Sequence, residues 1–224
     1  MNTLIAVAGC WHRGDRTQSQ RDTWARDCGA WFFVGRKPTD GWIAPSQTFE
    51  LDVDDSYAGL PEKVRGICRW GLENGFDSLC KLDDDVLLLP ERLDGVLGDA
   101  DYVGRFRAGY DGFPPYSSGF TYMLSRKAMQ IVADAELTND WAEDRWVGTI
   151  LSEAGVTTRD EKRFCCPFNG GLEPCGERIF QHALGRNGIS FAQLSPENIR
   201  DCWKWKQIIK PPWPLPARRR RRFR

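Results

Sequence analysis

Residues 81–86 read Lys81-Leu82-Asp83-Asp84-Asp85-Val86 and place three consecutive carboxylates between two apolar stretches. Phe76, Leu79 and Cys80 precede the triplet, and the apolar run 86–89 follows it. Mg²⁺ and Mn²⁺ favour carboxylate oxygens and often share them with the phosphates of a substrate. The triplet is therefore a candidate site for a divalent cation. An acidic turn between two buried elements explains these residues equally well, so other parts of the chain have to decide.

The first forty residues predict a parallel α/β sheet. Residues 3–10 form an apolar run typical of a buried strand, a helix is expected over 19–27, and 31–34 predicts a second strand. Ligands usually bind at the carboxyl ends of such strands. The intervening loop 11–16 contains His12, Arg13 and Arg16, which are candidate contacts for an anionic ligand. A solvated basic loop is the alternative.

The rest of the chain continues this alternation of strands and helices. We expect strands over 49–54, 101–107 and 119–124, another strand just before the aspartates, and helices over 61–74, after Pro90, after Ser125, from Glu143 and over 196–208. Residues 156–194 are rich in Gly and Cys and predict irregular structure. The fold class expected from this order is α/β, with one domain over residues 1–210.

The carboxyl-terminal segment differs in charge from the remainder. The formal net charge is zero, but six arginines lie among residues 218–224, so residues 1–217 carry a charge of about −6. Residues 211–224 are rich in Pro and Arg and predict a disordered tail. We expect at most weak contact between this tail and an anionic surface, and no stable nucleic-acid partner.

No run of about 18 apolar residues, the length of a membrane span, occurs in the sequence, and no signal segment opens it. We therefore expect a soluble protein of the cytoplasm.

Seven separate stretches, in this order, resemble the β-1,3-galactosyltransferase-like family of inverting, nucleotide-sugar-dependent transferases, which is related to fringe. They are Arg21-Asp22-Thr23-Trp24, Phe33-Val34-Gly35, the segment 52–63, the segment 81–86, Tyr116-Ser117-Ser118-Gly119 with its continuation to Ser125, Glu143-Asp144-Arg145-Trp146-Val147-Gly148, and the segment 195–203. The resemblance covers about residues 16–205. Each motif alone is weak, whereas seven in the right order are specific.

The resemblance implies a GT-A type fold, with a mixed, mostly parallel sheet flanked by helices. It assigns about residues 1–100 to binding of the donor nucleotide and about 101–210 to binding of the acceptor. The implied activity is a metal-dependent inverting hexosyltransferase, which moves galactose or N-acetylglucosamine from a UDP-sugar to a hydroxyl of a glycan acceptor in β linkage. The implied cofactor is Mn²⁺ or Mg²⁺.

The same resemblance implies roles for individual acids. Asp85 would bind the metal, while Asp83 and Asp84 would support the metal site and the sugar nucleotide. Asp144 would be the catalytic base, which fits the need to remove the proton of the attacking hydroxyl. Glu143 would orient Asp144 or the backbone, although an acid at a helix start also has an ordinary explanation in the helix dipole.

Four further positions match family motifs. Arg21 and Lys63 correspond to residues that hold the nucleotide end of the donor. Tyr116 and Gly119 belong to the stretch that closes over donor and acceptor.

The remaining metal ligand is ambiguous. Family members commonly have a histidine just before the last helix, where this chain has Gln193. His182 lies eleven residues earlier and is the predicted metal ligand. Gln193 or a water molecule are the alternatives.

Two other functions are compatible with parts of the sequence. A metal-dependent phosphodiesterase or nuclease would use the aspartates and the arginine-rich tail. A carbohydrate-binding protein without catalysis would use some of the ten tryptophans. The nuclease hypothesis leaves the motifs at Tyr116 and Glu143 unexplained.

Overall fold

The computed structural model describes residues 2–37, 45–109, 112–165 and 188–208. Its centre is a seven-stranded sheet in the order β3-β2-β1-β4-β7-β6-β8. The strands are β1 (Thr3–Ala8), β2 (Trp31–Val34), β3 (Thr48–Glu50), β4 (Ser78–Asp83), β6 (Tyr102–Arg107), β7 (Tyr116–Ser125) and β8 (Thr158–Asp160). The first four strands of the chain pair in parallel, β7 is antiparallel to β4 and β6, and β8 is parallel to β6. The expected α/β class and mixed, mostly parallel sheet are confirmed.

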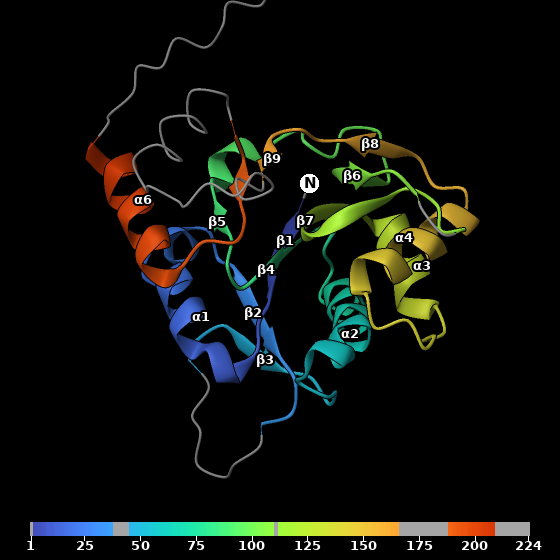
Figure 1. Cartoon of the computed structure of the whole chain (residues 1–224), viewed down its shortest axis with the longest axis horizontal. Coiled ribbons are helices and arrows are strands. Elements are labelled where there is room, and N and C mark those ends of the chain that lie inside the picture. The colour runs from blue at the N-terminus through green and yellow to red at the C-terminus, as the bar shows by residue number, and fades with distance from the viewer. Residues whose placement is uncertain (1, 38–44, 110–111, 166–187, 209–224) are drawn as a thin grey trace, which may run out of the picture.

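Helices cover both faces of this sheet (Figure 1). One face carries α1 (Gly14–Arg21) and α6 (Pro196–Ile208), and the other carries α2 (Leu60–Glu73), α3 (Arg126–Asp134) and α4 (Glu143–Glu153). Successive side chains of β1 enter different cores, because side chains alternate along a strand. Ile5 and Val7 pack on the α6 side, whereas Leu4 and Ala6 pack against α2 and α3.

The first helix differs from the expectation. Instead of one helix over 19–27, α1 ends at Arg21 and a separate 3-10 turn covers Trp24–Asp27. Thr23 leaves the helical conformation, with φ −122° and ψ −115°. The buried indole of Trp24 donates a hydrogen bond to the carbonyl of Val86 at 3.0 Å, so the chain turns to place this ring in the core.

Three other segments also depart from the sequence pattern. The strand expected over 49–54 ends at Glu50, because the amide of Val53 bonds the carbonyl of Leu51 in a tight turn. The helix expected after Pro90 is only a 3-10 turn over Pro90–Arg92. Short strands β8, β9 (Phe164–Cys165) and β10 (Ser190–Phe191) lie in the segment expected to be irregular; β9 and β10 form a second sheet with β5 (Leu87–Leu88).

Among the residues described, no helix combines the length and apolar character needed to cross a membrane. His182 and the tail 211–224 lie outside the described residues.

Candidate active site

The carboxyl ends of β1 and β4 meet at one edge of the sheet, because these strands are parallel neighbours with Ala8 paired to Asp83. The loops that follow them, together with the start of α4, enclose a pocket of about 300 Å³. Its lining includes Gly9, Cys10, Arg13, Asp55, Tyr57, Lys63, the three aspartates 83–85, Arg107, Ser118, Gly119, Glu143, Asp144 and Gln193. The strand ends therefore bring most of the predicted site residues together.

The aspartate triplet concentrates negative charge at one end of this pocket. Arg16 from α1 lies 3.2 Å from the Asp84 carboxylate and 3.4 Å from that of Asp85. Burial, with the adjacent carboxylates of Asp83 and Asp84, raises the pKa of Asp85 to about 6. Arg16 therefore only partly compensates the charge, and a bound cation would compensate more of it.

The chemistry of these oxygen atoms fits Mg²⁺ or Mn²⁺. Gln193 lines the same pocket, and the amide of the next residue, Leu194, donates to the Asp85 carbonyl at 3.0 Å. Within the described part of the chain, no three His, Cys, Asp or Glu side chains form a group that could hold a metal ion. The predicted ligand His182 lies outside the described residues. Among the described residues, the carboxylates of Asp85 and its two neighbours are those whose chemistry suits a divalent cation.

Asp144 lies in the first turn of α4 and faces the pocket. Its Oδ2 atom accepts a hydrogen bond from the Gly119 amide at 3.2 Å, and its Oδ1 atom accepts one from the Arg145 amide at 2.9 Å. Two backbone donors thus fix this half-buried carboxylate in the pocket lining. Gly119 is suited to this contact, because a Cβ there would lie 3.2 Å from the Asp144 side chain.

Glu143 has different partners from those expected. Its carboxylate is buried, accepting hydrogen bonds from the Tyr122 hydroxyl and, at 3.1 Å, from the Lys81 ammonium. In the described residues, the hydrogen-bond partners of the Glu143 carboxylate are thus the side chains of Lys81 and Tyr122, and not the Asp144 side chain or a backbone group. Glu143 instead connects α4 to the strands beneath it.

Lys81 is the main site residue that the sequence analysis did not identify. It is fully buried, and its Nζ atom donates to Asp83 and to the Gly119 carbonyl at 2.7 Å each, as well as to Glu143. Burial disfavours the charged ammonium, yet the carboxylates of Asp83 and Glu143 outweigh it and raise the pKa of Lys81. The sequence did contain a signal for this role, namely a lysine inside a buried strand. A buried charge needs partners of opposite charge, and these could have been sought.

Lys63, expected to hold the nucleotide end of the donor, lines the pocket, and its ammonium is bound to other residues of the protein. It lies 2.7 Å from the Asp55 carboxylate and 2.7 Å from the carbonyl of Gly9. Asp55 also accepts hydrogen bonds from the amides of Gly35 and Trp11. This ion pair therefore holds the loops after β1 and β2 in place at the pocket wall.

Arg21 does not line the pocket. Its guanidinium donates to Thr48 at 2.7 Å and to the carbonyl of Ser46, and lies 3.6 Å from the centre of the Phe32 ring. Burial lowers the pKa of Arg21 to about 10. These contacts fix β3 beside β2, so we leave Arg21 out of the proposed site.

Tyr116 is also absent from the pocket lining, and it packs against Gly148 of α4. A Cβ added at Gly148 would lie 2.3 Å from the Cβ of Tyr116. The tyrosine therefore sets how closely β7 and α4 approach. Through this packing it supports Asp144 without facing the pocket.

We expect Gly148→Ala to destabilise the protein by about 1–3 kcal/mol, because the added methyl group overpacks the contact with Tyr116. Denaturant unfolding measures the change. Gly14→Ala is the matched control, since nothing lies within 4 Å of a Cβ at this helical position. Equal stability of the two variants would contradict the packing argument.

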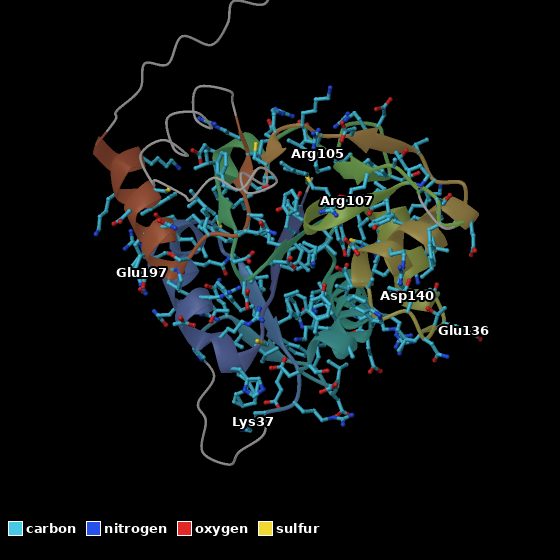
Figure 2. The ribbon with its side chains drawn as sticks, in the orientation of Figure 1. Lys37, Arg105, Arg107, Glu136, Asp140 and Glu197 are labelled. Atoms are coloured by element: carbon cyan, nitrogen blue, oxygen red, sulfur yellow. The ribbon has the colours of Figure 1, made fainter. Side chains whose placement is uncertain are left out.

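Arg107 is a second residue that sequence reasoning missed. It extends from the end of β6, and its Nε atom donates to the Ser118 hydroxyl at 2.7 Å (Figure 2). With Arg13 it gives the pocket two arginines in addition to the aspartates. A pocket with this charge pattern suits a ligand that combines anionic groups with a cation.

Comparisons with known proteins agree with the motif resemblance. The sequence is 22% identical over 186 residues to mouse UDP-GalNAc:beta-1,3-N-acetylgalactosaminyltransferase 2, a match that covers 72% of this chain and 34% of that protein. The chain thus spans about a third of the length of the curated relative it matches. No protein-family profile matches the sequence.

Two solved structures share the architecture. A glycosyltransferase involved in the glycosylation of the major capsid of PBCV-1 superposes with a TM-score of 0.51 at 9% identity, covering 90% of this chain and 99% of that one. The galactosyltransferase LgtC, solved with donor and acceptor sugar analogues, gives a lower TM-score of 0.47 at 13% identity, over 94% of this chain and 98% of that one. The protein therefore has a GT-A type fold, and its sequence is similar to that of a β-1,3-N-acetylgalactosaminyltransferase.

Proposed function

We infer that the protein is an inverting glycosyltransferase that moves a hexose or N-acetylhexosamine from a UDP-sugar to a hydroxyl of a glycan acceptor. The observation that carries this proposal is the placement of Asp83–Asp85 and Asp144 in one pocket of a GT-A type fold. The ordered motifs and the similarity to the mouse transferase support it. We assign donor binding mainly to residues 1–100 and acceptor binding mainly to residues 101–210.

The reaction requires two tasks, which we assign to different residues of the pocket. Asp85, with Asp83 and Asp84 beside it, would hold a divalent cation, which supplies charge neutralisation for the departing diphosphate. Arg13 and Arg107 add positive charge to the pocket lining. Asp144, fixed by the amides of Gly119 and Arg145, would accept the proton of the attacking hydroxyl. A single base opposite the leaving group leads to inversion at the anomeric carbon.

The test is turnover of nucleotide sugars by the full chain with Mn²⁺, using release of UDP as the readout. The panel should include UDP-galactose, UDP-N-acetylglucosamine and UDP-N-acetylgalactosamine, the last because the mouse relative is named for it. Transfer to a glycan acceptor, lost after chelation of the cation, is the expected result. Cleavage of nucleic acid without turnover of any sugar nucleotide would favour the phosphodiesterase alternative and contradict the proposal.

We expect Asp85→Asn to lower UDP release by about 10- to 100-fold at limiting Mn²⁺, because it removes a charged oxygen ligand. Added Mn²⁺ should restore part of the activity. Asp94→Asn, at an exposed turn outside the pocket lining, should behave as the parent protein. Undiminished activity of Asp85→Asn at every Mn²⁺ concentration would remove Asp85 from the cation site.

A further inference from the structure

Two large aromatic side chains, Tyr57 of the pocket lining and Trp141, are exposed and lie in contact with their rings tilted. Tyr57 retains 66% of its surface and Trp141 retains 57%. The centres of their rings lie 5.7 Å apart, with 51° between the ring planes. By contrast, Trp24 and Trp146 are almost completely buried. An exposed aromatic cluster at a pocket is a common sign of a binding surface.

The pair is linked to Asp144 both through the pocket lining and through the sequence. Tyr57 belongs to the pocket lining, at the turn that leads into α2, and Trp141 precedes Asp144 by three residues. Partial burial, followed by the charges of Asp144 and Asp83, raises the pKa of the Tyr57 phenol. A molecule resting on the two rings would therefore be within reach of Asp144.

The loop that carries Trp141 is held on both sides. Asp140 accepts a hydrogen bond from the Arg145 Nε atom at 2.6 Å and a second one from its Nη2 atom, and it also accepts one from the Ala142 amide at 3.0 Å. The guanidinium of Arg145 stacks 4.3 Å from the centre of the Phe113 ring. Figure 2 shows Asp140 in this loop, close to α3 and α4. The loop thus presents the Trp141 ring from a fixed backbone, which lowers the entropy lost on binding.

We propose that Tyr57 and Trp141 form a stacking surface for a pyranose ring of the acceptor glycan. A pyranose has an apolar face of C–H groups and a rim of hydroxyls, so an aromatic pair can cover the face while a hydroxyl points at a neighbouring carboxylate. Here that carboxylate is Asp144. This inference rests on the proposed function, because it uses Asp144 as the base.

The same rings have the chemistry to stack on the uracil of the donor. The position of the pair favours the acceptor, since Trp141 precedes by three residues the Asp144 that supplies the base. The acceptor has to reach Asp144, whereas the uracil does not. If the rings bind the acceptor, removing one of them should weaken acceptor binding and leave UDP binding unchanged. If they bind the uracil, the reverse is expected, so one set of variants distinguishes the two ligands.

Trp141→Ala should raise the KM for the acceptor by about 5- to 20-fold, the loss expected when one stacking ring is removed. The KM for the UDP-sugar should stay within about twofold, and Trp141→Phe should recover most of the acceptor affinity. Leu137→Ala is the matched control, because Leu137 is a 37% exposed apolar residue near the same loop that does not line the pocket. A selective fall in UDP affinity would assign the rings to the nucleotide and overturn the proposal.

A binding measurement keeps this inference separate from the catalytic one. Saturation-transfer NMR with methyl β-galactoside, methyl N-acetyl-β-glucosaminide and lactose reports contact with the protein without any turnover. We expect signals for at least one of these sugars in the parent protein and in Leu137→Ala, and their loss in Trp141→Ala and Tyr57→Ala. Such signals in a protein that shows no transfer would support the stacking surface while the transferase proposal fails. No signal with any of the three sugars, or signals unchanged in both variants, would overturn the stacking surface.

Discussion

Replacing Lys81 by methionine should destabilise the protein by about 3–5 kcal/mol, the range observed when one member of a buried ion pair is removed. The ammonium of Lys81 donates hydrogen bonds to Asp83, Glu143 and the Gly119 carbonyl at the same time. Methionine fills a similar volume but supplies no hydrogen-bond donor. Glu143, which is 3% exposed, then keeps only the Tyr122 hydroxyl among its described side-chain donors. Denaturant unfolding monitored by tryptophan fluorescence measures the loss.

Two further variants identify the cause of this loss. Lys81→Met combined with Glu143→Gln should recover part of the stability, because the uncompensated buried charge has been removed. Lys127→Met is the matched control, since Lys127 pairs with Asp101 but its side chain is 62% exposed, and its loss should cost less than about 1 kcal/mol. If Lys81→Met proved as stable as the control, the buried ion pair would not hold α4 on the sheet.

Asp144→Asn should reduce the rate of transfer by about 10²- to 10⁴-fold, the usual contribution of a positioned general base. Asparagine has nearly the same shape, and its side-chain oxygen can still accept a backbone hydrogen bond from Gly119 or Arg145. It cannot accept the proton of the attacking hydroxyl. The fold and the affinity for UDP should therefore be almost unchanged, so the loss should appear in kcat.

Single-turnover kinetics with saturating donor and acceptor measure the effect on chemistry, and calorimetric titration with UDP and Mn²⁺ checks that the donor site is intact. Asp134→Asn on α3 is the control, because its carboxylate is exposed and accepts a hydrogen bond from the side chain of Gln130, outside the pocket lining. Full activity of Asp144→Asn would remove this residue from the role of base. A parallel loss of UDP affinity would indicate that Asp144 supports donor binding instead.

The arrangement of the strands could be predicted because their patterns are local. Apolar runs at β1 and β4 and the amphipathic pattern of α2 are visible in the sequence, and parallel pairing then brings Asp83 to the edge reached by the loop after β1. The motif order further predicted that Asp144 would join this edge. The pocket lining agrees with that prediction.

Other features depend on partners distant in the sequence. The end of α1 depends on Trp24 reaching Val86, and the role of Lys81 depends on Glu143, 62 residues away. No local pattern contains these pairs. The short strands β8 to β10 likewise depend on distant partners, because β8 pairs with β6 and β10 pairs with both β5 and β9. Segments of two or three residues have too few positions to show a period.

The arrangement of β4 beside β7 has a consequence for the ancestry of this protein. Lys81 and Tyr122 are paired across these strands, and both donate to Glu143. A genetic crossover between residues 84 and 116 would inherit Lys81 from one parent and its tyrosine and glutamate from the other. Chimaeric proteins made with a diverged relative should therefore fold stably only where both parents carry the same residues at positions 81, 122 and 143.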